Sequence, residues 1–270
     1  MDLYEKVSDR LKNWASEVKD ARGVGIANIT TDAIKDLCGK QYFNLPLPFL
    51  KYIDDFRRKE GALQSISNYR DHFIHPFHVF ILGFYILNKT RKSNLEIFKF
   101  IKSGGNEEEI NLKVWFITAI YHDVGYPADK LEILVKDFFT ESVGRPMTSQ
   151  FDWSSVLLAG ENIHHINALA DLFHLKVNNI NESVKFKKWF YKRLLEEHDH
   201  GPLGSLMLCN QGWGEQEFSK YIYESALAIA LHSWSGSFKI QDKSSEKYLL
   251  DALILEKFPL AFFLSYCDNA

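Results

Sequence analysis

The chain has 270 residues, of which 46% are hydrophobic and 25% are charged, as is typical of a globular protein with room for one large domain. The formal net charge is only −3, which argues against a protein built around a general nucleic-acid surface. Its three cysteines, Cys38, Cys209 and Cys267, lack zinc-type pairing and disulfide density, so we expect a reducing compartment, the cytoplasm.

Apolar residues recur at three- and four-residue spacing along most of the chain, which predicts an all-α fold. The segment Asn44-Leu45-Pro46-Leu47-Pro48 predicts a break. Asn181 is a candidate N-cap for a helix whose basic face we interpret as solvated. The expected helices cover residues 1–20, 49–58, 75–88, 112–123 and 182–197, one from Pro202 to near Gly212, residues 221–232, and one from Pro259 to the C-terminus.

We expect a single helical domain over 61–270, with residues 1–60 as a helical lead-in packed on its core. An insertion at about 128–196 interrupts the domain, and within it residues 140–165, rich in Ser, Gly and Asn, predict a long connection or lid. The N-terminus has no apolar core, so we expect no secretory signal. The longest apolar stretch without a charge, 79–87, is too short for a bilayer, which takes roughly 20 residues, so no membrane partner is expected.

His122-Asp123 is the most informative feature, because two side chains able to bind metal end an apolar helix and a Gly and a Pro follow. A charged Asp buried there costs solvation free energy unless it has a partner, and a metal ion is one. Other expected helices also present a candidate ligand at or near an end: His75, His200, His232 and Asp268. Imidazole and carboxylate ligands together suit Mn, Fe, Co, Ni or Zn. We therefore predict that these elements converge on one ion or on an ion pair.

This pattern resembles the HD superfamily of metal-dependent phosphohydrolases. His122-Asp123-Val124-Gly125 is similar to its His-Asp-hydrophobic-Gly turn, and His200 with Gly204 resembles its His-x-x-x-Gly element. Residues 260–268 resemble its closing helix, which presents the last Asp. The matched elements run from residue 70 to residue 268, about three-quarters of the chain.

The resemblance implies that His75, His122, Asp123 and Asp268 hold one metal. His200 and His232 would hold a second, with Asp123 bridging the two ions. A bridging water acidified by both cations would then become the hydroxide that attacks phosphorus. The chain departs from the pattern in places: Tyr126 stands where the branch that cleaves cyclic dinucleotides has a Lys.

Several further residues are candidates beside this centre. Asp71 and His72 precede the His75 helix and could donate a proton or bind substrate, while Arg70 could hold a phosphate oxygen. Lys130 and Arg145 are substrate-binding candidates of the same kind, and Tyr126 could stack on a base. His164-His165 competes with His200 as a metal ligand. Because Asp268 lies two residues from Ala270, we expect the natural chain to continue further.

The sequence thus predicts a phosphohydrolase or phosphodiesterase that acts on a small-molecule phosphoester, a nucleotide being the expected substrate class. Its cofactor would be one or two divalent transition-metal ions. Two alternatives remain open. One is a diiron oxygenase, because similar His and Asp sets can hold two irons and activate oxygen. The other is an HD-type signalling module that binds a ligand without turnover. The oligomeric state is not predicted.

Overall fold

The computed structural model describes residues 2–63, 73–91, 107–127, 160–178, 180–197, 199–211, 216–232 and 257–270. Within these ranges the chain is all-α, as predicted, and forms one compact domain. The helices are α1 (Leu3–Val18), α2 (Val24–Cys38), α3 (Leu47–Leu63), α4 (Ile74–Arg91), α5 (Glu107–Tyr121), α8 (Gly160–Val177), α9 (Ile180–Leu195), α10 (His200–Cys209), α11 (Gln216–His232) and α13 (Pro259–Asp268).

Local sequence explains how the first helix begins and which face it buries. The Asp2 carboxylate accepts a hydrogen bond from the backbone N–H of Glu5, whose side chain accepts one from the Asp2 backbone, so a capping box starts α1. Its buried face then packs on α4, where Trp14 meets the edge of Phe77 and Tyr4 stacks on Phe84. The helix predicted over residues 1–20 is confirmed.

Three expectations from sequence need correction. Residues 160–165, expected within a connection or lid, are the first turns of α8, whose buried residues Ile166, Leu169 and Phe173 recur at helical spacing. Asn181 lies inside α9 and does not cap it. The helix expected to end near Gly212 is α10, which begins at His200 and ends at Cys209. Helix α2 was not among the helices expected from the sequence.

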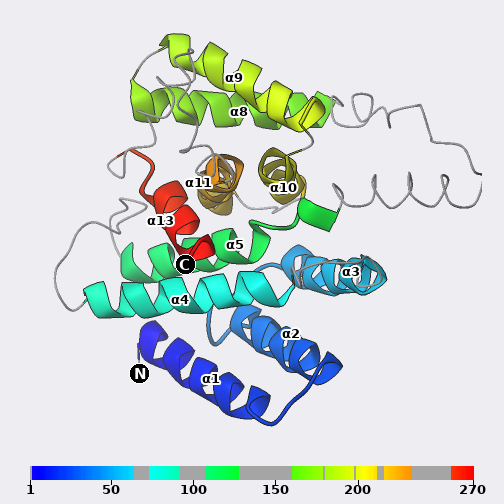
Figure 1. The fold of residues 1–270 in the computed structure, drawn as a ribbon. Coiled ribbons are helices and arrows are strands. Elements are labelled where there is room, and N and C mark those ends of the chain that lie inside the picture. The colour runs from blue at the N-terminus through cyan, green and yellow to red at the C-terminus, as the bar shows by residue number, and fades with distance from the viewer. Residues whose placement is uncertain are drawn as a thin grey trace, which may run out of the picture.

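The helices form successive layers (Figure 1). The pair α8 and α9 lies along one side, α10 and α11 come next and are seen nearly end-on, and α4 with α5 runs across beneath them. Helices α1 and α2 lie on the far side of α4, and α3 lies beyond one end of α4 in contact with α2. α13 packs against both α11 and α4, so the end of the chain reaches the middle of the stack.

Helices α4 and α5 are in close contact in the middle of this stack. A Cβ at Gly83 would lie 2.2 Å from Cζ2 of Trp115, so only glycine lets the indole lie against the α4 backbone. The Trp115 Nε1–H donates to the carbonyl of Phe80 at 3.1 Å, which satisfies its polar edge. The position of α4 relative to α5 is therefore tightly fixed, and with it the ends of the two helices that carry His75 and His122.

The described part of the predicted insertion, α8 and α9, contributes Phe173, Phe186 and Phe190 to the same buried cluster as the other helices. The predicted division near residue 60 falls inside α3 and stays a prediction. None of the described helices is both long and apolar enough to cross a membrane.

Candidate metal centre

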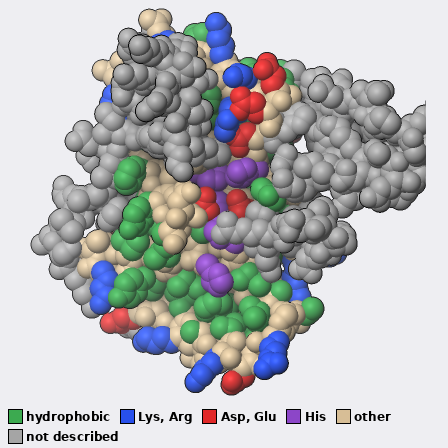
Figure 2. Space-filling view, viewed as in Figure 1, with side chains coloured by type: hydrophobic (Ala, Val, Ile, Leu, Met, Phe, Trp, Pro, Cys, Tyr) green, Lys and Arg blue, Asp and Glu red, His purple; other side chains and the backbone are tan. Residues whose placement is uncertain are grey.

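All six predicted metal ligands lie at the ends of helices that meet in the middle of the domain. His75 is the second residue of α4, and His122 and Asp123 directly follow α5. His200 is the first residue of α10, whereas His232 and Asp268 are the last residues of α11 and α13. Figure 2 shows histidine and acidic side chains gathered near the centre of one face.

The side-chain atoms of this six-residue centre are close enough to share ions. His75 Nε2 lies 2.7 Å from Asp268 Oδ1, and His122 Nε2 lies 3.3 Å from the same oxygen. On the other side, His200 Nε2 lies 3.3 Å from His232 Nε2 and 3.7 Å from Asp123 Oδ1. Asp123 stands between the two sides, because its Oδ2 lies 4.0 Å from His75 Nε2.

Two overlapping groups have donor atoms within 4.8 Å of one another: His75, His122 and Asp268, and His122, Asp123 and His232. Nitrogen and oxygen ligands bind transition metals at about 2.0–2.2 Å, so atoms on one ion lie within about 4.4 Å of each other. The observed separations need only small side-chain movements to meet this limit. The donor set fits one or two borderline divalent ions.

Two of the histidines are oriented by backbone carbonyls. The Nδ1–H of His122 donates to the carbonyl of Ala119 at 2.7 Å, and that of His232 donates to Ile229 at 2.5 Å. Each acceptor lies three residues earlier, at the end of the same helix, and leaves Nε2 directed to the centre. The Nε2 of His122 is buried and makes no hydrogen bond among the described residues, as expected for a ligand atom.

The pKa values of the two buried imidazoles, His122 and His232, shift in opposite directions. Burial disfavours the charged form of His122, but the carboxylates of Asp123 and Asp268 outweigh it and raise its pKa to about 9. Burial, with the imidazoles of His200 and His122, lowers the pKa of His232 to about 4. Burial also opposes ionisation of Asp268, yet contacts with His122 and His75 hold its pKa well below the usual range. Without an ion, the carboxylates of Asp123 and Asp268 stabilise a proton on His122. A bound cation would take the place of that proton.

Glycines bring the His122-Asp123 turn against α10. A Cβ at Gly125 would lie 2.3 Å from the carbonyl oxygen of His200 and 2.8 Å from the backbone nitrogen of Gly204. A Cβ at Gly204 would in turn meet Val124 Cγ1 at 3.1 Å. Gly125 and Gly204 thus permit one close backbone contact, which sets the distance from Asp123 to His200.

The centre is open on one side. His122, Asp123 and His232 are almost fully buried, whereas the His200 side chain is 27% exposed and that of Asp268 is 23% exposed. The Tyr126 ring lies 5.7 Å from the His200 ring, edge to face, at this open side. Solvent therefore reaches the centre at the side chains of His200 and Asp268.

Other histidines of the described chain lie elsewhere. His78 projects from the exposed side of α4, where its ring meets Trp14, and not into the centre. His164 is exposed on α8, and His165 Nδ1 lies 2.8 Å from the hydroxyl of Tyr223, so neither joins the centre in place of His200. The substrate-binding and proton-transfer candidates Arg70, Asp71, His72, Lys130 and Arg145 lie outside the described residues.

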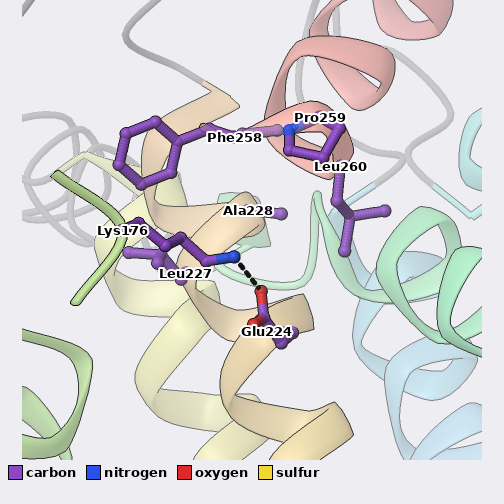
Figure 3. Close-up of a pocket in the computed structure, with 8 residues that line it drawn as sticks. Lys176, Glu224, Leu227, Ala228, Phe258, Pro259 and Leu260 are labelled. Atoms are coloured by element: carbon purple, nitrogen blue, oxygen red, sulfur yellow. Dashed lines mark ion pairs between the residues drawn. The ribbon is translucent and has the colours of Figure 1, made fainter. Parts of the chain in front are cut away.

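Two pockets in the described part of the chain lie apart from the centre. One, about 670 Å³, lies between α3 and α10 and includes Tyr52 and Met207 in its lining. The other holds only about 10 Å³ and lies where the Lys176–Glu224 ion pair approaches the start of α13 (Figure 3). Neither pocket is lined by a residue of the six-residue centre.

Comparisons with protein-family models, with curated proteins and with solved structures find no match to this chain. Function must therefore be inferred from the chemistry of these side chains.

Proposed function

We propose that this protein is a metal-dependent phosphohydrolase of the HD type that cleaves a phosphoester, with a nucleotide as the expected substrate class. One observation carries the proposal: four histidines and two aspartates from five separate chain segments converge on one partly open, otherwise buried centre. Buried imidazoles and carboxylates in contact are costly unless they are paired or bind an ion.

The side chains would divide between two ions. His75, His122 and Asp268 form the first group, while His200 and His232 approach Asp123 from the other side. Asp123 has one oxygen toward His75 and one toward His200, as a bridging ligand would. Divalent ions bound there would lower the pKa of water and neutralise charge on phosphoryl oxygens.

Residues of the chain would supply the remaining functions. The open side, with Tyr126 beside His200, would admit the substrate and give a flat ring against which a base can lie. Asp71, His72 and Arg70, which directly precede the His75 helix, stay candidates for proton transfer and for binding a phosphate oxygen. The tight turn at Gly125 would hold Asp123 in its position between the two groups.

Metal content is the first test. Protein purified without chelator should carry about two Mn or Fe per chain by plasma mass spectrometry, and His200→Ala should carry about one. His164→Ala is the matched control, because this exposed histidine on α8 lies outside the centre. If neither purified protein nor protein reconstituted with Mn, Fe, Co or Ni retains metal, the proposal is wrong.

Activity is the second test. Mn-loaded protein should cleave at least one member of a phosphoester panel that includes nucleotides, and His122→Ala and Asp123→Ala should abolish that cleavage. Oxygen-dependent turnover with iron alone would favour the diiron oxygenase instead. Tight nucleotide binding with no product would favour a signalling module.

A further inference from the structure

Among the described residues, no backbone carbonyl bonds to the ring of His200, in contrast to the rings of His122 and His232. His122 and His232 come at the ends of helices and donate to carbonyls three residues earlier. His200 is the first residue of α10, so no preceding helical turn offers it a carbonyl. Its Nδ1 instead faces a carboxylate, with Asp199 Oδ1 at 3.6 Å.

Asp199 is itself held from two directions. Its Oδ1 accepts from the backbone N–H of Gly201 at 3.0 Å and so caps α10. Its Oδ2 accepts from Arg193 Nε at 2.7 Å and also pairs with Nη2 of the same guanidinium. The backbone N–H of Asp199 donates to the Arg193 carbonyl at 2.9 Å, so the end of α9 and the start of α10 are joined twice.

This arrangement exceeds what a helix cap requires. A cap needs one side-chain oxygen, and Ser, Thr or Asn would serve as well. Here the carboxylate is nearly buried, with 5% of the side chain exposed, and Arg193 compensates its charge. A carboxylate that accepts a hydrogen bond from the outer nitrogen of an imidazole orients a metal-binding histidine and increases its basicity. At 3.6 Å, Asp199 Oδ1 is just beyond that bond to His200 Nδ1, so a small rotation of the ring would form it.

We propose that Asp199, held by Arg193, is the positioning residue for His200 and thereby sets the affinity of the ion that His200 binds. The inference rests on the proposed metal centre. Arg193 acts through Asp199, and its partner Glu197, which pairs with Nη1, completes the guanidinium's contacts at the surface.

The test is a titration of metal-free full-length protein with Mn²⁺, with free ion measured by electron paramagnetic resonance. His200→Ala identifies the binding step that depends on His200. In Asp199→Asn, which keeps the cap but removes the charge, that step should weaken about 10- to 100-fold while the other step keeps its affinity. Arg193→Gln, which leaves the carboxylate but removes its clamp, should weaken the same step by a smaller factor.

The chain offers a matched control. Asp2 caps α1 and pairs with Arg91 Nη2 at 2.8 Å, so it repeats the capping carboxylate held by an arginine. Arg91 lies 16 residues along α4 from His75, about 24 Å at 1.5 Å per residue. Asp2→Asn should therefore leave both binding steps unchanged.

The outcomes separate this inference from the proposed function. Wild type that binds none of Mn²⁺, Fe²⁺, Co²⁺ and Ni²⁺ would overturn both. Wild type that binds it, with an unchanged His200-dependent step in Asp199→Asn and Arg193→Gln, would overturn only the role of Asp199. Equal weakening of both steps, together with lost helicity by circular dichroism, would overturn it too, because Asp199 would then act only through the fold.

Discussion

The Nε2 atom of His75 lies 2.7 Å from Oδ1 of Asp268, although 193 residues separate them in sequence. The contact joins the start of α4 to the last residue of α13, and Asp268 reaches His122 from the same position. Because α13 also packs on α11, a single short helix brings the final ligand to both α4 and α5. The centre thus depends on where α13 docks.

Replacing Asp268 should therefore remove one ion. We expect Asp268→Ala to bind about one fewer Mn or Fe per chain, because His75 and His122 lose the oxygen that they share. Asn269→Ala is the control, since the Asn269 side chain is exposed and bonds only to the Ser265 carbonyl among the described residues. Plasma mass spectrometry measures the metal content per chain, and equal content in the two variants would refute the role of Asp268.

Gly125 should be needed for both stability and metal binding. In Gly125→Ala the new Cβ would meet the backbone of His200 and Gly204, which cannot yield as a flexible side chain can. We expect a loss of about 1–3 kcal/mol in the free energy of unfolding and weaker binding of the His200-dependent ion.

Gly160→Ala serves as the comparison for that variant. Gly160 is the first residue of α8, and among the described residues an added Cβ there meets nothing within 4 Å. Gly160→Ala should be neutral or slightly stabilising in denaturant unfolding and should bind Mn²⁺ as wild type does. A Gly125→Ala protein that matches wild type in both measurements would contradict the argument from close packing.

The sequence predicted the centre better than its surroundings, for physical reasons. A His or Asp at the end of an apolar helix is conspicuous, so the placement of His122 and His232 at helix ends that meet could be expected without coordinates. The start of α8 was hidden because Gly160 and Glu161 are exposed and polar, and the burial that forms the helix begins only at Ile166. The contact of Asp199 with Arg193 joins two helix ends and leaves no periodic signal.

The sequence pattern does not predict helix α2, for a related reason. Its buried face includes Thr30 and Thr31, which read as polar in sequence. Thr30 accepts a hydrogen bond from Trp14 Nε1 at 3.2 Å, and Thr31 donates to the carbonyl of Ala27 at 2.7 Å. Local bonds of this kind let hydroxyls enter a core that periodicity alone would assign to apolar residues.

The contact of Gly83 with Trp115 gives a second stability prediction. Gly83→Ala would put a Cβ 2.2 Å from the indole, which is itself buried and bonded to Phe80, so we expect a loss of about 1–3 kcal/mol. Gly25→Ala in α2 meets its nearest atom at 3.7 Å and should be neutral or stabilising by up to about 1 kcal/mol. Urea unfolding midpoints that move equally in the two variants would contradict this difference.

The three thiols should be unreactive in the folded protein. Burial raises the pKa of Cys38 and Cys209 well above the usual range, and burial with the Asp268 charge raises that of Cys267 to about 12. Because the thiolate is the reactive form, a disulfide exchange reagent at pH 8 should label none of them until denaturant is added. Rapid labelling of the native protein would show that the core around α2, α10 and α13 opens easily.

The Lys176–Glu224 ion pair should couple α8 to α11 more strongly than a surface pair does. Lys176 Nζ lies 2.9 Å from Glu224 Oε2, and the two side chains are only 19% and 14% exposed. Beside them is the cavity of about 10 Å³ at the start of α13, which has room for no more than about one water molecule to solvate a charge left alone. Removing one partner should therefore cost more than removing both.

A double-mutant cycle measures that coupling. Lys176→Met and Glu224→Gln should each lower the free energy of unfolding, and the double variant should recover part of the loss, for a coupling of about 0.5–3 kcal/mol. Lys12 and Asp9, 2.8 Å apart but more than half exposed, form the control pair and should couple more weakly because water screens them. Additive losses at Lys176 and Glu224 would mean that each side chain stabilises the fold by packing alone.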